Sequence, residues 1–442
     1  MIVFLIIILA AILRLTNLSN LPPGLYLDEV LYGLDAYSLI HTGKDIYGHF
    51  LPLALQSSGY YPPLFTYILA PFFLIFPLAA WVVRLPAALA GITTVVVLYY
   101  FTRQLVGKKH SSTPLFAATL LAFSPYHLHF SRVAFLASFG IIFSLLATYL
   151  FLKQRILLSA IIFGLSTHVH YGYKLFSPLL FGVLIILYRT RLKFRRLIIP
   201  LILVSFITLF SNWYAVTRYN ALSRVDQLSG ASLNQMITGY LKVFSPQFLF
   251  FKSGDYLLTN PWNKGLLLTS LLPAFIVGTL KLRRLSLNSL VILFLWLLIP
   301  PVPSALAGAA THLLRLSPIL IPLTIISALG LETLFAKSRL VGLSLVVLIS
   351  LETLSAFKFY TRIYPQVSAD LWGQPQRQLI HEAVTQSKPI LTDSFNTLLA
   401  FYAFEAKTPP QILQQTILQP ITLNGLPAKK IDHVYFIPAE EL

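Results

Sequence analysis

The chain has 442 residues, of which 56% are hydrophobic and 11% charged, and its mean hydropathy is +0.75. This composition excludes a soluble globular protein with an ordinary charged surface and predicts that most of the chain lies in lipid. The formal charge is +18, but the basic residues follow the ends of apolar segments, which argues against a nucleic-acid-binding face. The sequence contains no cysteine, which excludes disulfide bonds and cysteine-ligated metals.

The apolar segments predict about eleven transmembrane helices. Five basic clusters, around Arg103, Lys153, Arg189 to Arg196, Arg283 and Lys337, are expected in cytoplasmic loops, so the segments between them must cross the membrane in pairs. The N-terminal segment lacks the basic region and cleavage site of a signal peptide, so we expect it to be retained. The expected spans are residues 2–15, 82–102, 113–125, 133–151, 155–168, 174–188, 197–212, 264–280, 288–301, 317–335 and 339–356.

Two regions lie outside this series of spans. The stretch from Pro62 to Pro77 is apolar but interrupted by prolines, so we expect a re-entrant or interfacial helix within a first outer loop of about residues 16–81. From residue 357 polar residues return, and PILTDS, HVYFIP and QRQLIHEAV read as two strands and a helix. We therefore predict a membrane domain over residues 1–356 and a small extracytoplasmic α/β domain over residues 357–442.

Acidic residues narrow the place where chemistry can occur. None falls between Asp45 and Asp226, and a coupled transporter normally needs a carboxylate inside a span. The adjacent pair Asp28 and Glu29 follows a Pro-Pro-Gly turn and precedes a helical pattern, so both sit where the helix dipole stabilises a carboxylate. An N-cap on a solvated loop is the alternative for such a pair. The tyrosines around it favour a sugar site.

Basic and imidazole side chains on the expected outer side are the second ingredient. Arg132, Lys174 and Arg315 each stand where an outer loop enters a span, at the depth of a lipid phosphate, although interfacial snorkelling would also explain each one. Arg315, beside His312, is the strongest candidate for a phosphate contact. The histidine pairs at two-residue spacing have no neighbouring carboxylate, so we assign no metal and expect sugar hydrogen bonding instead.

Five segments, taken in order over residues 1–356, carry a family resemblance. They are LRLTNLSNLPPGLYLDE, YYPPLFTYILAPFF, VRLPAALAGITTVVVLYYFTRQLVG, AFSPYHLHFSR and THLLRLSPILIPL. This set resembles the GT-C glycosyltransferases of the dolichyl-phosphate-mannose protein mannosyltransferase and ArnT type. The resemblance implies a GT-C fold, Asp28 as catalytic base with Glu29 alongside, and Arg315 on the phosphate of the lipid carrier. Two positions depart from it: Tyr60 and Tyr61 stand where ArnT-like relatives carry Glu-Lys, and Lys174 stands where an Arg is frequent.

The sequence therefore predicts an inverting transfer of sugar from a polyprenyl-phosphate donor to an acceptor hydroxyl outside the plasma (inner) membrane. Arg315 would hold the donor phosphate with Lys174 or Arg132, and no cofactor or nucleic acid is implied. The side chains expected around the sugar are Tyr26, Tyr32, Tyr60, Tyr61, His127, His170 and His312. A transporter of lipid-linked saccharides and an inactive scaffold member of the family are the alternatives. The sugar and the acceptor, which could be a protein, a lipid or a polysaccharide, are not specified by these patterns.

Overall fold

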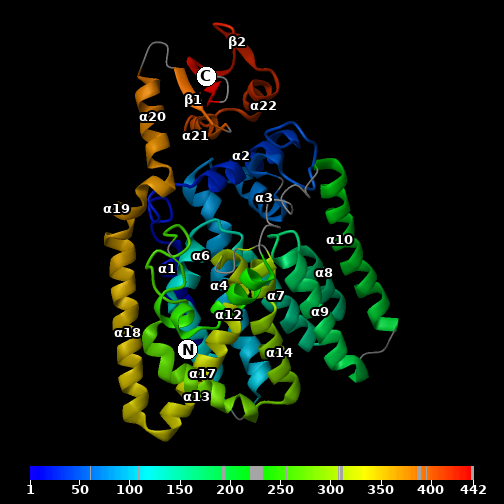
Figure 1. The fold of residues 1–442 in the computed structure, drawn as a ribbon, viewed down its shortest axis with the longest axis vertical. Coiled ribbons are helices and arrows are strands. Elements are labelled where there is room, and N and C mark those ends of the chain that lie inside the picture. Colours follow the sequence, from blue (N-terminus) through cyan, green and yellow to red (C-terminus); the bar gives the residue numbers. More distant parts are fainter. Residues whose placement is uncertain are drawn as a thin grey trace. The chain divides into compact units, whose positions relative to one another are not determined.

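The computed structural model describes residues 1–59, 61–107, 110–191, 195–219, 232–254, 256–306, 308, 312–385, 390–394 and 396–439. The chain forms two compact units. Unit 1 comprises Met1–Thr16 and Ala87–Ile363, and unit 2 comprises Asn17–Pro86 and Tyr364–Leu442. The ribbon is drawn in Figure 1, and each unit is described by itself.

Unit 1 is built from helices alone among its described residues. In chain order they are α1 (Ile2–Leu15), α4 (Ala80–Val106, which starts in unit 2), α5 (Thr113–Phe123), α6 (Pro125–Arg132), α7 (Ala137–Leu152), α8 (Ile156–Ser166), α9 (Tyr173–Tyr188), η3 (Arg189–Arg191), α10 (Arg195–Tyr219), α12 (Leu233–Lys242), η4 (Gln247–Phe251), η5 (Thr269–Leu271), α13 (Leu272–Lys281), η6 (Leu282–Arg284), α14 (Leu287–Leu298), α15 (Pro301–Leu306), α16 (Leu313–Leu316), η7 (Ser317–Ile319), α17 (Leu320–Lys337) and α18 (Arg339–Arg362).

Each of the eleven expected spans contains a helix, so the mainly helical architecture is confirmed. The predicted start of the span at residues 264–280 is wrong: α13 begins only at Leu272, because the apolar residues 266–268 lie in an irregular segment before it. Within the described part of the chain, four helices are long and apolar enough to cross a membrane, or five if the pair α6 and α7, bent by 110°, counts as one span. The protein is therefore a multi-pass membrane protein, while the total of eleven crossings stays a prediction. Two helices run past their expected ends, α10 to Tyr219 and α18 to Arg362, because helical hydrogen bonding continues beyond the point where hydropathy falls.

Glycine allows the closest helix packing in unit 1. A Cβ placed on Gly330 of α17 would lie 1.7 Å from the carbonyl oxygen of Ala274 in α13, and one on Gly278 of α13 would lie 1.9 Å from the carbonyl oxygen of Ile326. Only two residues without side chains let the backbones approach so closely.

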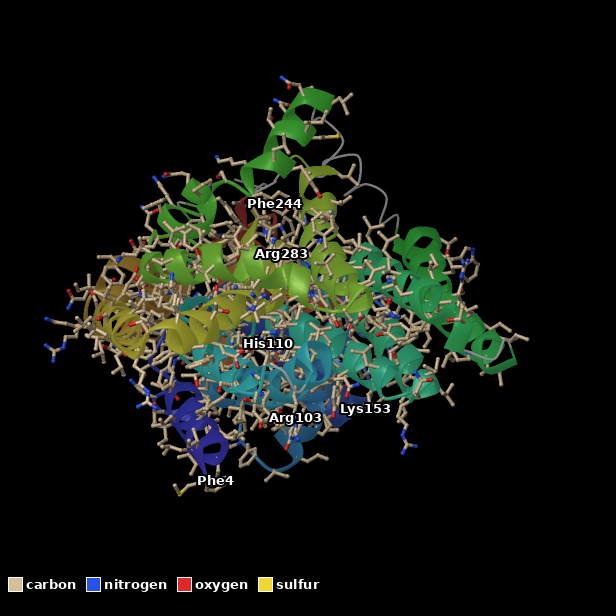
Figure 2. The ribbon with its side chains drawn as sticks, turned by 90° about the horizontal axis from the view of Figure 1, so that it is seen from below. Phe4, Arg103, His110, Lys153, Phe244 and Arg283 are labelled. Carbon is tan, nitrogen blue, oxygen red and sulfur yellow. The ribbon has the colours of Figure 1, made fainter. Side chains whose placement is uncertain are left out.

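The basic residues expected in cytoplasmic loops gather at one end of unit 1. Arg103 lies in the last turn of α4, Lys153 follows α7 and Arg283 follows α13, and all three are seen from this end in Figure 2. Residues 108, 109 and 192–194 of the expected clusters fall outside the described residues. The shared end is the arrangement that the positive-inside rule anticipates.

Unit 2 combines the first loop with the C-terminal tail. Its elements are α2 (Leu27–Thr42), η1 (Gln56–Ser58), α3 (Leu64–Leu69), η2 (Ala70–Leu74), α19 (Tyr364–Ser368), η8 (Ala369–Trp372), α20 (Gln374–Val384), β1 (Ile390–Asp393), α21 (Thr397–Glu405), α22 (Pro410–Leu418), β2 (Ile421–Leu423), β3 (Leu426–Ile431) and β4 (Val434–Pro438). The sheet order is β1-β4-β3-β2, with β1 parallel to β4 and the other pairs antiparallel. The strands expected in PILTDS and HVYFIP and the helix in QRQLIHEAV are confirmed. The proline-rich apolar stretch forms the short elements α3 and η2, whose interfacial position stays a prediction.

Candidate active site

The predicted acidic pair opens the first turn of α2 in unit 2. The chain is extended at Tyr26, the residue before the helix, and Asp28 and Glu29 follow within the first turn, where the unpaired backbone N–H groups favour negative charge. The turn leading to them requires glycine at position 24. Gly24 has φ +131°, and a Cβ there would lie 2.3 Å from the carbonyl oxygen of Trp372.

Glu29 is held in a buried ion pair with Arg84. The Nε and one terminal nitrogen of the guanidinium donate to the two carboxylate oxygens of Glu29 at 2.9 and 2.8 Å, and both side chains are 0% exposed. The remaining N–H groups of Arg84 donate to the carbonyl oxygens of Leu18 at 2.9 Å, Pro22 at 3.0 Å and Gly24. Arg84 therefore ties the start of α2 to the turn that precedes it.

Asp28 has a different environment from its neighbour. It is half-buried, and the hydroxyl of Tyr61 donates to its Oδ2 at 3.4 Å, a long hydrogen bond. Burial, and then the charge of Asp28, raise the pKa of Tyr26 well above its ordinary value, so that this hydroxyl keeps its proton. The two adjacent carboxylates thus differ: Glu29 is enclosed and paired, and Asp28 is more accessible.

Aromatic side chains surround this turn, as the sequence predicts. Tyr32, which is 2% exposed, packs edge-to-face on Tyr61 and on Phe65, with ring centroids 5.9 and 5.4 Å apart. Tyr26 makes an edge contact with Trp372 at 5.8 Å, and the guanidinium of Arg84 lies 5.4 Å from the centre of the same indole. Tyr60 falls outside the described residues.

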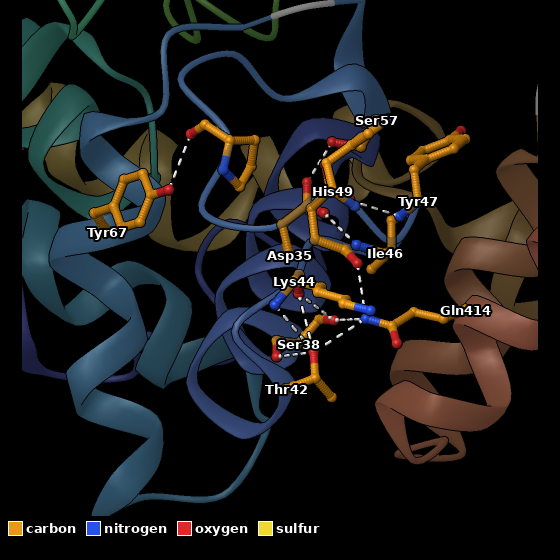
Figure 3. A network of polar contacts seen from close by, with 12 residues as sticks. Asp35, Ser38, Thr42, Lys44, Ile46, Tyr47, His49, Ser57, Tyr67 and Gln414 are labelled. Carbon is orange, nitrogen blue, oxygen red and sulfur yellow. Dashed lines mark hydrogen bonds and ion pairs between the residues drawn. The ribbon is translucent and has the colours of Figure 1, made fainter.

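A third carboxylate of α2, Asp35, lies two turns further on and is fully buried, as Glu29 is. Asp35 accepts hydrogen bonds from the backbone N–H of Ile46 at 3.1 Å and from the hydroxyl of Ser57, as Figure 3 shows. Burial raises the pKa of Asp35 to about 7, and the nearby charge of Asp45 acts in the same direction. Asp35 therefore takes up its proton near neutral pH, at a place separate from Asp28 on the helix.

The same network joins the first loop to the tail. The side-chain amide of Gln414 in α22 lies 2.9 Å from the hydroxyl of Ser38, 3.0 Å from that of Thr42 and 2.9 Å from the carbonyl oxygen of Asp45 (Figure 3). These contacts explain why residues far apart in the chain form one compact unit.

Two segments of unit 1 lie side by side, and they carry the predicted phosphate-binding residues Lys174 and Arg315. The hydroxyls of Tyr173 and Ser317 are 3.0 Å apart. A Cβ on Gly172 would lie 3.7 Å both from Cα of Arg315 and from Nδ1 of His170. The backbone thus brings these segments into contact without a bulky residue at position 172.

The charge of this segment pair resides on its Lys and Arg. Lys174 lies in the first turn of α9 with its Nζ 5.2 Å from the ring centre of Tyr171, and Arg315 lies in α16. Burial, reinforced by the charge of Arg315, lowers the pKa of His312 to about 4, so its imidazole is neutral at neutral pH. An anion here would meet cationic side chains and a neutral imidazole.

Arg132 and His127 have internal partners in unit 1. Arg132 is 2% exposed, and its guanidinium donates to the carbonyl oxygens of Leu13 and Thr16, the second at 2.7 Å, where α1 ends. His127 is 0% exposed and its Nδ1 lies 2.8 Å from a guanidinium nitrogen of Arg14. In this conformation both side chains bind other parts of unit 1, so their roles at the donor stay a prediction.

The sequence does not predict that Arg84 and Trp372 belong to the site. Arg84 could have been singled out, because it is a basic residue on the expected outer side, where the positive-inside rule does not place one. Trp372 could not, since it lies in the tail, far along the chain. Among the described residues there is no group of three or more His, Cys, Asp or Glu that could hold a metal ion.

Comparison with known proteins supports the expected family. Residues 61–215 match the family model for dolichyl-phosphate-mannose-protein mannosyltransferase. The fold is similar to ArnT from Cupriavidus metallidurans bound to undecaprenyl phosphate, at 14% identity and TM-score 0.53, over 96% of this chain and 91% of that one. It is similar to the oligosaccharyltransferase AglB from Archaeoglobus fulgidus in complex with an inhibitory peptide and a dolichol-phosphate, at 14% identity and TM-score 0.53, over 91% of this chain but only 63% of that one. No curated protein matches the sequence. The predicted resemblance to GT-C proteins of the mannosyltransferase and ArnT type is confirmed.

Proposed function

We propose that this chain, with its GT-C fold and its match to the mannosyltransferase family, is a membrane glycosyltransferase that uses a polyprenyl-phosphate sugar as donor. The observation that carries the proposal is the difference between the environments of two adjacent carboxylates: Glu29 is buried in an ion pair with Arg84, and Asp28 is half-buried beside Tyr61. Neighbouring acids in unlike environments are a common mark of acid-base catalysis.

Asp28 is the general base in this mechanism. As an acceptor hydroxyl attacks the anomeric carbon, its proton passes to Asp28, the new glycosidic bond forms and the bond to the phosphate oxygen breaks. A single displacement of this kind inverts the anomeric configuration. Glu29, enclosed by Arg84, positions the turn and does not exchange a proton with substrate.

Arg315 and Lys174 bind the phosphate of the lipid carrier. The departing phosphate has low basicity, so cationic side chains stabilise it without donating a proton. The guanidinium of Arg315 can make two parallel hydrogen bonds to phosphate, whereas Lys174 contributes a point charge. The neutral state of His312 leaves this charge to the Lys and Arg.

The positive-inside arrangement supports an extracytoplasmic site in the plasma (inner) membrane. Arg103, Lys153 and Arg283 mark the end of unit 1 that we expect on the cytoplasmic side. Lys174 lies in the first turn of α9 and Arg315 in α16, before α17, and the basic clusters of Arg189 and Lys337 lie at the other ends of these helices. The acceptor is a hydroxyl-bearing protein, lipid or polysaccharide presented on that side, and the sugar is a hexose or a pentose.

Transfer of labelled sugar from a set of polyprenyl-phosphate donors to membrane acceptors, in vesicles containing the purified protein, tests the function. We expect label on an acceptor with the wild type and a raised KM for the donor in Arg315→Met. The matched control is Arg339→Met, at the start of α18, which should leave KM unchanged. Label that crosses the membrane on an unchanged donor would identify a transporter instead. Absence of any sugar transfer would refute the assignment as a glycosyltransferase.

A further inference from the structure

An apolar groove runs along unit 1 between α1 and α18. α1 packs on α5 and α18 packs on α17, while α5 and α17 pack on each other and form the floor of the groove. The cavity has a volume of about 550 Å³, and its lining includes Leu9 of α1, Leu120 of α5, Leu331 of α17 and both Val346 and Ile349 of α18. None of these residues belongs to the candidate active site.

Few side chains of the groove lining are polar, and two of the hydroxyls are bonded within their own helices. The hydroxyl of Thr119 donates to the carbonyl oxygen of Leu115 at 2.9 Å, and that of Thr324 donates to the carbonyl oxygen of Leu320 at 2.6 Å. The wall is thus mainly hydrocarbon, which does not hold ordered water. An empty groove of this size would also forfeit the dispersion contacts of its lining, so an apolar occupant is favoured.

The rim of the groove is formed by exposed apolar side chains, which would face the hydrocarbon of a bilayer. Ile2 and Leu5 of α1 are 57% and 55% exposed, and Leu354 of α18 is 62% exposed. α18 is one of the helices long and apolar enough to span a membrane, yet only 22% of its apolar window is buried in the protein. A chain from the surrounding lipid can therefore enter sideways.

The length of the groove fits one leaflet. From Val346 to Phe357 the lining of α18 rises by about 16 Å at about 1.5 Å per residue. Half of a hydrocarbon core about 30 Å thick is about 15 Å. This is the depth reached by the acyl chain of a phospholipid, which ends at the midplane.

Two exposed lysines lie at one end of the groove. Lys358 follows the lining residue Phe357, and Lys264 lines a small adjoining cavity that shares Leu266–Leu268 with the groove. Glu352 lines that small cavity too, but its carboxylate accepts the backbone N–H groups of Thr269 and Ser270 at 3.0 and 2.8 Å. The net charge at this end is thus positive and suits an anionic head group.

We propose that the groove binds one acyl chain of an anionic phospholipid, whose phosphate lies at Lys358 and Lys264. The lipid fills the space between α1 and α18 and is a structural ligand rather than a substrate. The proposal does not depend on the transferase activity.

The test compares two tryptophan variants of neighbouring residues. Val346→Trp fills the groove, whereas Val347→Trp adds the same side chain at a position 56% exposed on the same helix. Each protein is reconstituted in vesicles of equal phosphatidylglycerol and phosphatidylethanolamine and repurified in detergent, and the retained lipid is extracted and identified by mass spectrometry. Thermal unfolding of both variants checks that they fold.

We expect wild type and Val347→Trp to retain phosphatidylglycerol, Val346→Trp to lose it, and the double variant Lys264→Gln, Lys358→Gln to lose the preference for phosphatidylglycerol. Equal retention by Val346→Trp and Val347→Trp would overturn the proposal. So would a wild type that carries no phospholipid, or one that carries a polyprenyl phosphate in its place.

Discussion

Removal of the Arg84 guanidinium should destabilise unit 2 more than the loss of any exposed ion pair. In Arg84→Met the Glu29 carboxylate stays buried without its bidentate partner, and the carbonyl oxygens of Leu18, Pro22 and Gly24 lose their donors. Breaking a buried pair from one side costs about 3–5 kcal/mol, and the unpaired carbonyl oxygens add to that.

The chain offers a matched control in the same unit. Arg377 pairs with Glu405 at 2.8 Å, with side chains 36% and 43% exposed. Solvent screens such a pair, so Arg377→Met should cost only about 0–1 kcal/mol. Denaturant-induced unfolding in detergent, followed by tryptophan fluorescence, measures both variants. Equal losses of stability in Arg84→Met and Arg377→Met would refute the role assigned to the buried pair.

Three further predictions concern pH, packing and the link to the tail. Burial raises the folded-state pKa of Asp35 to about 7, so the folded state binds the proton more tightly than the unfolded state does. The stability that this group contributes is therefore lost as the pH rises from about 4 to about 7. Asp35→Asn should flatten the decrease in the free energy of unfolding across this pH range, and an unchanged decrease would contradict the raised pKa. Gly330→Ala should destabilise unit 1 by about 1–3 kcal/mol, because the new Cβ would clash with the backbone of α13. Gly182→Ala, which has open space around its Cβ, should not destabilise it. Equal melting temperatures of the two variants would refute the packing argument. Gln414→Ala removes three contacts to the first loop and should lower the stability of unit 2 by about 1 kcal/mol. Amide hydrogen exchange in α22 should therefore be faster than in the control Gln415→Ala. Identical exchange in the two variants would refute the link between the tail and the first loop.

The sequence predicts the helices of this protein well and its long-range contacts poorly. Hydropathy and the basic clusters suffice to locate a helix in every expected span, because burial in lipid requires continuous apolar segments with satisfied backbones. Helix ends are less well predicted, as the extension of α18 to Arg362 shows, since a helix can continue into water as long as its hydrogen bonds do.

The residues of the candidate site are likewise predictable from sequence only in part. Asp28 and Glu29 could be singled out from their position before a helix, but their different environments depend on Arg84, which is 55 residues away from Glu29. The contact of Gly24 with Trp372 joins the first loop to the tail, and no local pattern encodes it. The use of Gln414 to tie the tail to the first loop depends on tertiary packing for the same reason.

The central claim is that Asp28 removes the proton of the acceptor, and one experiment separates this from a role in folding or binding. Donor affinity and the rate of sugar transfer are measured in parallel on wild type, Asp28→Asn and the exposed control Asp370→Asn. The account predicts that Asp28→Asn binds the donor as wild type does while its turnover falls by about 10²–10⁴-fold, and that Asp370→Asn changes neither. Wild-type turnover in Asp28→Asn, with the donor still bound, would contradict it.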